Sequence, residues 1–157
     1  MNKLLKMSSV FAIVAGIILV VGGIWGISFT HENISREKIV TAEDSAMPGV
    51  PLSGPRSLRA QADIIREHTL KTTGGKTYAE MPRQIPQLDA SGKPALDEKG
   101  EQIMVNNAPR DLWVTATTLT TALNLAIFTY VFSSLVILLG LISLWTGFLF
   151  HSLRKHY

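Results

Sequence analysis

The residues of this chain that could bind phosphate lie at Gly74-Gly75-Lys76-Thr77, which has the ending of a phosphate-binding loop. In such a loop, backbone N–H groups surround the phosphates and the lysine reaches them. The full motif also needs a glycine five residues before Gly75, where this chain has Leu70, and a strand before the loop. A helix is expected there instead, so we interpret the two glycines as the end of that helix.

A second group of residues has metal-binding chemistry. Asp63, Glu67 and His68 lie close together on the same expected helix, and His31 lies elsewhere in the middle segment. Two histidines and a carboxylate can hold non-haem iron. His68, however, is turned about 100° around the helix from Glu67, and no second histidine follows four residues later. We interpret these side chains as a solvated helix face.

Asp89, Ser91 and Lys93 have the spacing of the first ligands of a calcium loop. A lysine at the third of these positions, and the lack of a glutamate at the twelfth loop position, argue against calcium. A turn is the simpler interpretation. No serine, histidine and aspartate have the local context of a nucleophilic site, and the chain has no cysteine. We therefore expect no catalytic residue, no metal and no cofactor.

The charge distribution separates the ends of the chain from its middle. The net charge is +3, but all 12 acidic residues lie between Glu32 and Asp111. The two ends carry the basic residues Lys3, Lys6, Arg154 and Lys155. This excess lies next to apolar blocks, as in a membrane protein, so we exclude nucleic acid as a partner.

Two apolar blocks are long enough to cross a bilayer. Residues 7–29 carry no charge, and neither do residues 119–150. We expect transmembrane helices at 7–29 and 122–150, with tails at 1–6 and 151–157. A cleaved signal peptide is the alternative for the first block. That block is long for a signal core, and no Ala-x-Ala site follows it.

The basic ends predict a plasma-membrane protein with both termini in the cytoplasm and residues 30–121 outside. Within this outer segment we expect an amphipathic helix at about 57–72, a turn-rich hairpin at about 87–105 and a helical extension from about 111. The predicted fold class is mainly α: a transmembrane helical hairpin with a small, partly helical extracytoplasmic domain. Its candidate surface residues are Asp63, Glu67, His68, Lys76, Tyr78 and Trp113.

Small residues recur four positions apart in both apolar blocks, a spacing that permits close packing of transmembrane helices. In an antiparallel hairpin, the inner pairs would lie at one depth and the outer pairs at another. The candidate packing residues are Ala12, Gly16, Gly22 and Gly26 in the first block, and Thr129, Ser133, Ser143 and Gly147 in the second. Packing within the chain and packing against a partner are both open at this point.

Residues 61–68 and 73–80, with 112–117 and 121–124, resemble a family of actinobacterial two-span membrane proteins of unknown function. The resemblance covers most of the chain apart from the hairpin near 87–105. Members often carry the label "aromatic ring-opening dioxygenase", an activity that would need metal ligands. Small two-span proteins of similar build also occur as accessory subunits of the actinobacterial respiratory supercomplex, which is an architectural analogy.

Neither apolar block contains an ionisable residue, which argues against a transporter or pump. We therefore expect a non-enzymatic accessory or structural subunit of a larger membrane complex, with membrane lipids and larger integral membrane subunits as partners. A homo-oligomer is an open alternative for the assembly. The alternative function is an extracytoplasmic ligand-binding or sensing module anchored by the two spans, and an enzyme is the third hypothesis.

Overall fold

The computed structural model describes residues 2–154, so Lys155, expected in the C-terminal tail, lies outside the described residues. The described chain is mainly α-helical and confirms the predicted fold class at that level. In chain order its elements are α1 (Asn2–Arg36), α2 (Pro55–Thr72), the short 3-10 helix η1 (Tyr78–Glu80), β1 (Gln84–Pro86), β2 (Met104–Asn106) and α3 (Ala108–Arg154).

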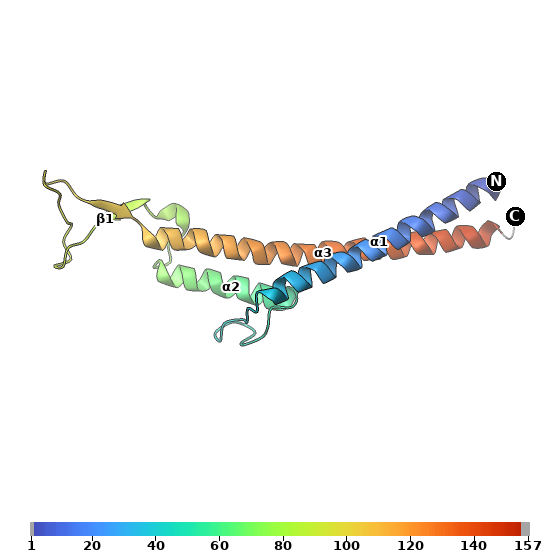
Figure 1. Ribbon diagram of the computed structural model, residues 1–157, viewed down its shortest axis with the longest axis horizontal. Coiled ribbons are helices and arrows are strands. Elements are labelled where there is room, and N and C mark those ends of the chain that lie inside the picture. Colours follow the sequence, from blue (N-terminus) through green and yellow to red (C-terminus); the bar gives the residue numbers. More distant parts are fainter. Residues whose placement is uncertain (1, 155–157) are drawn as a thin grey trace.

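The two long helices α1 and α3 pack against each other in opposite directions, with both chain ends at one end of the molecule (Figure 1). Both are long and apolar enough to span a membrane, and most of their apolar residues are exposed rather than buried. The 47 residues of α3 make a helix of about 70 Å, and the 35 residues of α1 one of about 52 Å. The N-terminal part of α3 therefore extends beyond α1, and α2 packs beside it.

α3 begins at Ala108, about three residues before the start that the sequence predicts near residue 111, and this start is fixed by Asn107. Its carbonyl oxygen accepts the N–H groups of Arg110 and Asp111 at 2.9 and 3.1 Å. Its side-chain amide donates to the carbonyl of Pro82 at 2.9 Å. Pro109 is tolerated in this first turn because an N–H there would have no partner within the helix.

The amphipathic helix α2 begins at Pro55, two residues before the expected start, since proline suits the first helical position. The Ser57 hydroxyl accepts the N–H of Ser53 at 3.2 Å. At the other end Gly74 and Gly75 have positive φ, and the N–H of Gly75 donates to the carbonyl of Leu70 at 2.8 Å. The double glycine is thus a helix cap, as the sequence predicts.

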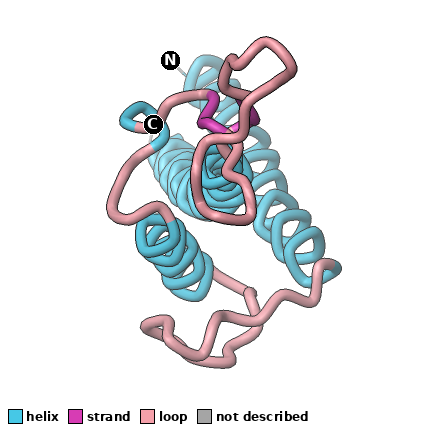
Figure 2. The backbone as a smooth tube through the Cα atoms, turned by 90° about the vertical axis from the view of Figure 1, so that its left-hand side faces the viewer, coloured by secondary structure: helices cyan, strands magenta, loops and turns pink. Residues whose placement is uncertain are grey.

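The segment between η1 and α3 is an exposed hairpin. Strands β1 and β2 pair antiparallel, with Ile85 opposite Val105. Beyond them the chain makes two turns in which Asp89 and Asp97 each accept backbone N–H groups through Oδ1. Figure 2, turned 90° from Figure 1, shows these loops lying over the end of the helices.

A small hydrophobic core holds the middle region to the helices. It consists of Leu52, Leu58 and Tyr130, and half-buried side chains of α1 and α3 pack around it. The Tyr130 hydroxyl donates to the carbonyl of Ser53 at 3.1 Å, so the loop between α1 and α2 is fixed to α3. This core lies where all three helices meet.

Candidate functional site

The contact between α1 and α3 is built from small residues seven positions apart. These positions are buried, and we call them the small-residue seam: Ser9, Gly16, Gly23 and Thr30 on α1, and Ser133, Gly140 and Gly147 on α3. A repeat of seven residues keeps one side of each helix facing the other and produces a left-handed supercoil. The seam is therefore the structural basis of the helical hairpin.

The seam brings the two backbones into direct contact. A Cβ atom placed on Gly16 would lie 2.8 Å from the carbonyl oxygen of Gly140, and one on Gly23 would lie 2.8 Å from that of Ser133. A Cβ on Gly147 would lie 3.0 Å from the backbone nitrogen of Ile13. Such distances leave no room for a side chain, so glycine is required at these points for the observed packing.

Two side-chain hydrogen bonds cross the seam near the chain ends. The Ser9 hydroxyl donates to the carbonyl of Gly147 at 2.8 Å, and this serine is buried. The Ser143 hydroxyl donates to the carbonyl of Ala12, also at 2.8 Å. Both acceptors already belong to helical hydrogen bonds, so the serines add interhelical bonds without breaking the helices.

The structure brings most of the predicted packing residues to this contact. Gly16, Gly26, Ser133 and Gly147 face the opposite helix, and Ala12 accepts the hydrogen bond from Ser143. Thr129 is half-buried and donates its hydroxyl within its own helix, to Leu125 at 2.9 Å.

Gly22 does not pack against α3, which corrects its prediction as a packing residue of the hairpin, because nothing lies within 4 Å of a Cβ placed on it. The spacing of four missed Ser9, Gly23 and Gly140. A search at a spacing of seven would have found these three positions, because seven residues are nearly two full helical turns.

The faces of α1 and α3 turned away from the seam carry large apolar side chains. Trp25 and Phe29 stack with ring centres 5.4 Å apart, and Phe128 and Phe132 stack at 6.0 Å. All four rings are more than half exposed in the described chain. These faces are suited to contact with lipid or with another membrane helix.

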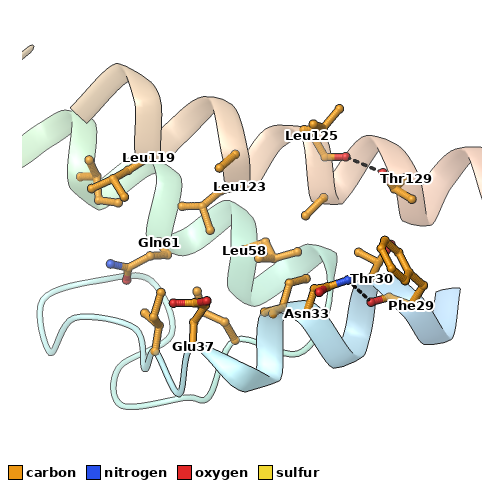
Figure 3. Close-up of a pocket in the computed structure, with 16 residues that line it drawn as sticks. Phe29, Thr30, Asn33, Glu37, Leu58, Gln61, Leu119, Leu123, Leu125 and Thr129 are labelled. Atoms are coloured by element: carbon orange, nitrogen blue, oxygen red, sulfur yellow. Dashed lines mark hydrogen bonds between the residues drawn. The ribbon is translucent and has the colours of Figure 1, made fainter. Parts of the chain in front are cut away.

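A groove of about 650 Å³ lies between α1, α2 and α3, at the end of the apolar blocks nearer the middle segment. Figure 3 shows Phe29 and Thr129 at one end of it, Leu58 and Leu123 in the middle, and Glu37 and Gln61 toward the other end. Most of its lining side chains are apolar. The surface candidates that the sequence places on α2, Asp63, Glu67 and His68, do not line this groove, whereas the predicted packing residue Thr129 does.

The candidate surface residues of α2 are each paired on the helix exterior. Asp63 lies 2.9 Å from Nε of Arg59, and Glu67 accepts from Lys71 at 2.8 Å. His68 lies 2.6 Å from the carboxylate of Asp44 in the preceding loop. The hydrogen bond with His68 lowers the pKa of Asp44 below its usual value. These pairs point to different neighbours, so the three side chains do not form a common site.

The other surface candidates meet near the start of α3. The buried Trp113 indole donates to the carbonyl of Lys76 at 2.9 Å. The guanidinium of Arg110 lies 3.8 Å from the ring centre of Tyr78, and its Nε is buried without a hydrogen-bond partner among the described residues. A pocket of about 280 Å³ opens here, lined by Tyr78, Arg83, Asn106, Arg110 and Asp111.

No group of three or more His, Asp and Glu side chains that could hold a metal ion lies within residues 2–154. The carboxylate of Asp89 is occupied instead by its own turn, accepting from the Ser91 hydroxyl at 2.7 Å and the Lys93 N–H at 3.0 Å. These hydrogen bonds lower the pKa of Asp89, the one from the Ser91 side chain most.

Comparisons with protein families, with curated proteins and with solved structures find no match for this chain. The contacts of its residues are therefore the basis for inferring a role.

Proposed function

We propose that this protein is an accessory subunit of a larger membrane complex, anchored as a two-span helical hairpin. The observation that carries the proposal is the difference between the inner and outer faces of α1 and α3. The residues of the small-residue seam pack within the chain, whereas large aromatic and aliphatic side chains remain on the outer faces. Such a hairpin is a rigid unit with two apolar faces free for neighbouring subunits or lipid.

The orientation we propose has both chain ends in the cytoplasm and α2, η1 and the hairpin outside. Lys3 and Lys6 flank one apolar block and the other is followed by Arg154 and Lys155, with no acidic residue at either end. Basic residues close to transmembrane segments favour the cytoplasmic side. The N-terminal turns of α3, with α2 packed against them, would then stand outside the membrane as a stalk for contact with the outer parts of a partner.

A respiratory supercomplex of the actinobacterial kind is our specific candidate for the larger assembly. The support is the architectural analogy and the sequence resemblance described above, together with apolar blocks that contain no ionisable residue. Without such residues, the spans are suited to packing against redox or transport subunits rather than to moving ions themselves.

Purification of the tagged full-length protein in a mild detergent tests this proposal. We expect larger integral membrane subunits in a fixed ratio, identified by mass spectrometry of the native complex. Replacing Phe128 and Phe132 by alanine should weaken their recovery, whereas the same change at Val114, which lies outside the apolar blocks, should not. Recovery of a lone monomer from membranes solubilised under several mild conditions would rule out the accessory role.

The alternative function, a ligand-binding module on the outer side, is favoured by the pocket beside Arg110. The unpartnered Nε of Arg110 and the nearby Arg83 give this pocket two guanidinium groups, which suit a phosphate or carboxylate. Binding of a phosphate-bearing envelope polymer to the full-length protein in nanodiscs would support this function. The binding should be lost in Arg110→Gln and kept in Arg59→Gln, whose guanidinium pairs with Asp63.

A further inference from the structure

We propose that the groove between α1, α2 and α3 holds one phospholipid of the outer leaflet, with an acyl chain along its apolar part and a protonated amine headgroup at Glu37. The proposal needs the two-span anchorage but is independent of the accessory role. It concerns a lipid that stays bound to this chain, in contrast to the lipids that exchange freely around any membrane helix.

The polarity of the groove changes along its length in the same direction as that of a lipid. At the end nearer the apolar blocks lie Phe29 and Leu125. The polar side chains at this end, those of Thr30, Asn33 and Thr129, each donate to a carbonyl of their own helix (Figure 3). The other end carries Glu37 and Gln61 beside the apolar Leu119, with Leu58 and Leu123 between the two ends (Figure 3). An acyl chain matches the first end, and a charged headgroup matches the second.

The depth of the groove matches the outer boundary of the bilayer. Phe29 is the last residue of the uncharged block of α1, and Glu37 follows it after eight residues, or roughly 12 Å at the helical rise. The headgroup layer on each side of a bilayer is about 5–8 Å thick. Glu37 therefore lies just beyond the outer edge of this layer, and Phe29 lies at the edge of the hydrocarbon. The groove spans the headgroup layer, so an acyl chain held in it would be drawn outward from the hydrocarbon beside Phe29.

The size of the groove fits one acyl chain. Its wall on α3 runs from Leu119 to Thr129, which is about 15 Å of helix. The volume of about 650 Å³ also lies within the usual range of ligand sites, roughly 300–1,000 Å³.

The charge of the groove selects among headgroups. Glu37 is the one charged side chain among the described lining residues, and it makes no ion pair within residues 2–154. The Gln61 side-chain oxygen accepts the N–H of Ala42 at 3.1 Å, which leaves its NH₂ group free to donate. A carboxylate and an amide donor suit an ammonium and a phosphate oxygen, the two groups of phosphatidylethanolamine.

Photocrosslinking of the full-length protein tests the site. The protein is placed in phosphatidylcholine nanodiscs with a small share of phosphatidylethanolamine that carries a diazirine in its acyl chain. We expect labelled peptides from the groove walls in the wild type. In Ala122→Trp, which fills the groove, labelling should fall to background. Thr121→Trp is the matched control. Residue 121 is next to residue 122 at nearly the same depth, is exposed and does not line the groove.

The headgroup requirement has its own test. Glu37→Gln should reduce the preference for phosphatidylethanolamine over phosphatidylglycerol by about tenfold, since a charge-assisted hydrogen bond is lost and an anionic headgroup is no longer repelled. Native mass spectrometry of the detergent-solubilised protein counts the lipids that stay bound. Circular dichroism on each variant checks that the helices are kept, and Leu119→Trp is a second blocking variant in case Ala122→Trp does not fold.

Equal labelling of Ala122→Trp and Thr121→Trp would overturn the proposal. So would the loss of every lipid from the wild-type protein at detergent concentrations that keep it folded. A photoreactive amino acid introduced at position 122 that crosslinks to a protein, without lipid labelling of the wild type, would show that a partner segment occupies the groove and would overturn the proposal as well. These outcomes leave the accessory role unaffected, because that role is tested by the recovery of partner subunits.

Discussion

Gly16 and Gly140 face each other across the contact between α1 and α3, each at the point where the other's carbonyl oxygen approaches. A Cβ on Gly16 would lie 2.8 Å from the carbonyl oxygen of Gly140, and one on Gly140 would lie 2.9 Å from that of Gly16. The contact is thus reciprocal and involves backbone atoms that cannot move aside. Helix association in a membrane depends on such close packing, because lipid supplies no hydrophobic drive between helices.

Replacing Gly140 by leucine should destabilise the hairpin by about 1–3 kcal/mol or more, since overpacking forces the backbones apart. The matched control is Gly22→Leu, where nothing lies within 4 Å of the new Cβ and the side chain points away from α3. Unfolding in mixed micelles of increasing SDS content measures the difference. A control variant as destabilised as Gly140→Leu would contradict the importance of this contact.

The long helices and their antiparallel pairing could be predicted from the sequence, because two uncharged blocks of sufficient length have few alternatives in a bilayer. The exact contact residues could not. A spacing of four selected Gly16 and Gly26 correctly but also Gly22, which is exposed. Gly23 and Gly140 each lie seven residues from another contact glycine, which is nearly two full helical turns, and a spacing of four does not detect that repeat.

The groove was not predictable for a different reason. Its lining comes from α1, α2 and α3, which are far apart in sequence, and its shape depends on how the loop from residue 37 to 54 folds back. That loop is positioned by long-range contacts such as the hydrogen bond from Tyr130 to Ser53. In contrast, the helix cap at Gly74 and the turn at Asp89 were predicted, because local hydrogen bonds determine both.

Removing the hydroxyl of Ser9 should weaken helix pairing by roughly 0.6 kcal/mol, the average for interhelical hydrogen bonds in membranes. Ser143→Ala should have a similar effect, because both serines donate to a carbonyl of the opposite helix at 2.8 Å. Ser8→Ala is the matched control, since Ser8 is exposed. SDS titration again gives the free energy of unfolding. An effect of Ser8→Ala equal to that of Ser9→Ala would show that these hydrogen bonds do not contribute.

Trp113 connects α3 to the turn after α2, so its replacement should loosen the outer domain. Trp113→Phe removes the hydrogen bond to the Lys76 carbonyl and should cost about 0.5–1.5 kcal/mol. Trp113→Ala also leaves a cavity and should cost about 3–5 kcal/mol. In nanodiscs, trypsin cleavage after Lys71 and Lys76 should be faster in Trp113→Phe than in the wild type, and faster again in Trp113→Ala. Unchanged cleavage in Trp113→Ala would mean that the turn is held by other contacts.

The pair of Asp44 and His68 makes the attachment of the loop after α1 sensitive to acid. The hydrogen bond with His68 lowers the pKa of Asp44 below its usual 3.8, with a smaller attraction from Lys71. Because the folded-state pKa is the lower one, the stabilising contribution is fully present above about pH 4 and is lost as the pH falls through the folded-state pKa.

A carboxyl-carbon NMR titration measures this effect directly. In His68→Ala the midpoint of Asp44 should rise toward 3.8. Glu80 is the internal control, because its pKa is lowered by hydrogen bonds with Thr77 and should not respond to the change at His68. A midpoint of Asp44 that is the same in both proteins would contradict the contact.

The orientation of the chain can be tested because it contains no cysteine, so a single introduced thiol reports one position. Ser91→Cys places the thiol on the exposed turn of the hairpin. Met7→Cys is the inner probe, because a change at Lys6 would remove one of the basic residues that we expect to hold the N-terminus inside. A membrane-impermeant maleimide should label residue 91 in intact cells, and residue 7 only after the membrane is opened. Labelling of residue 7 in intact cells would reverse the proposed topology and would place the groove and the stalk on the cytoplasmic side.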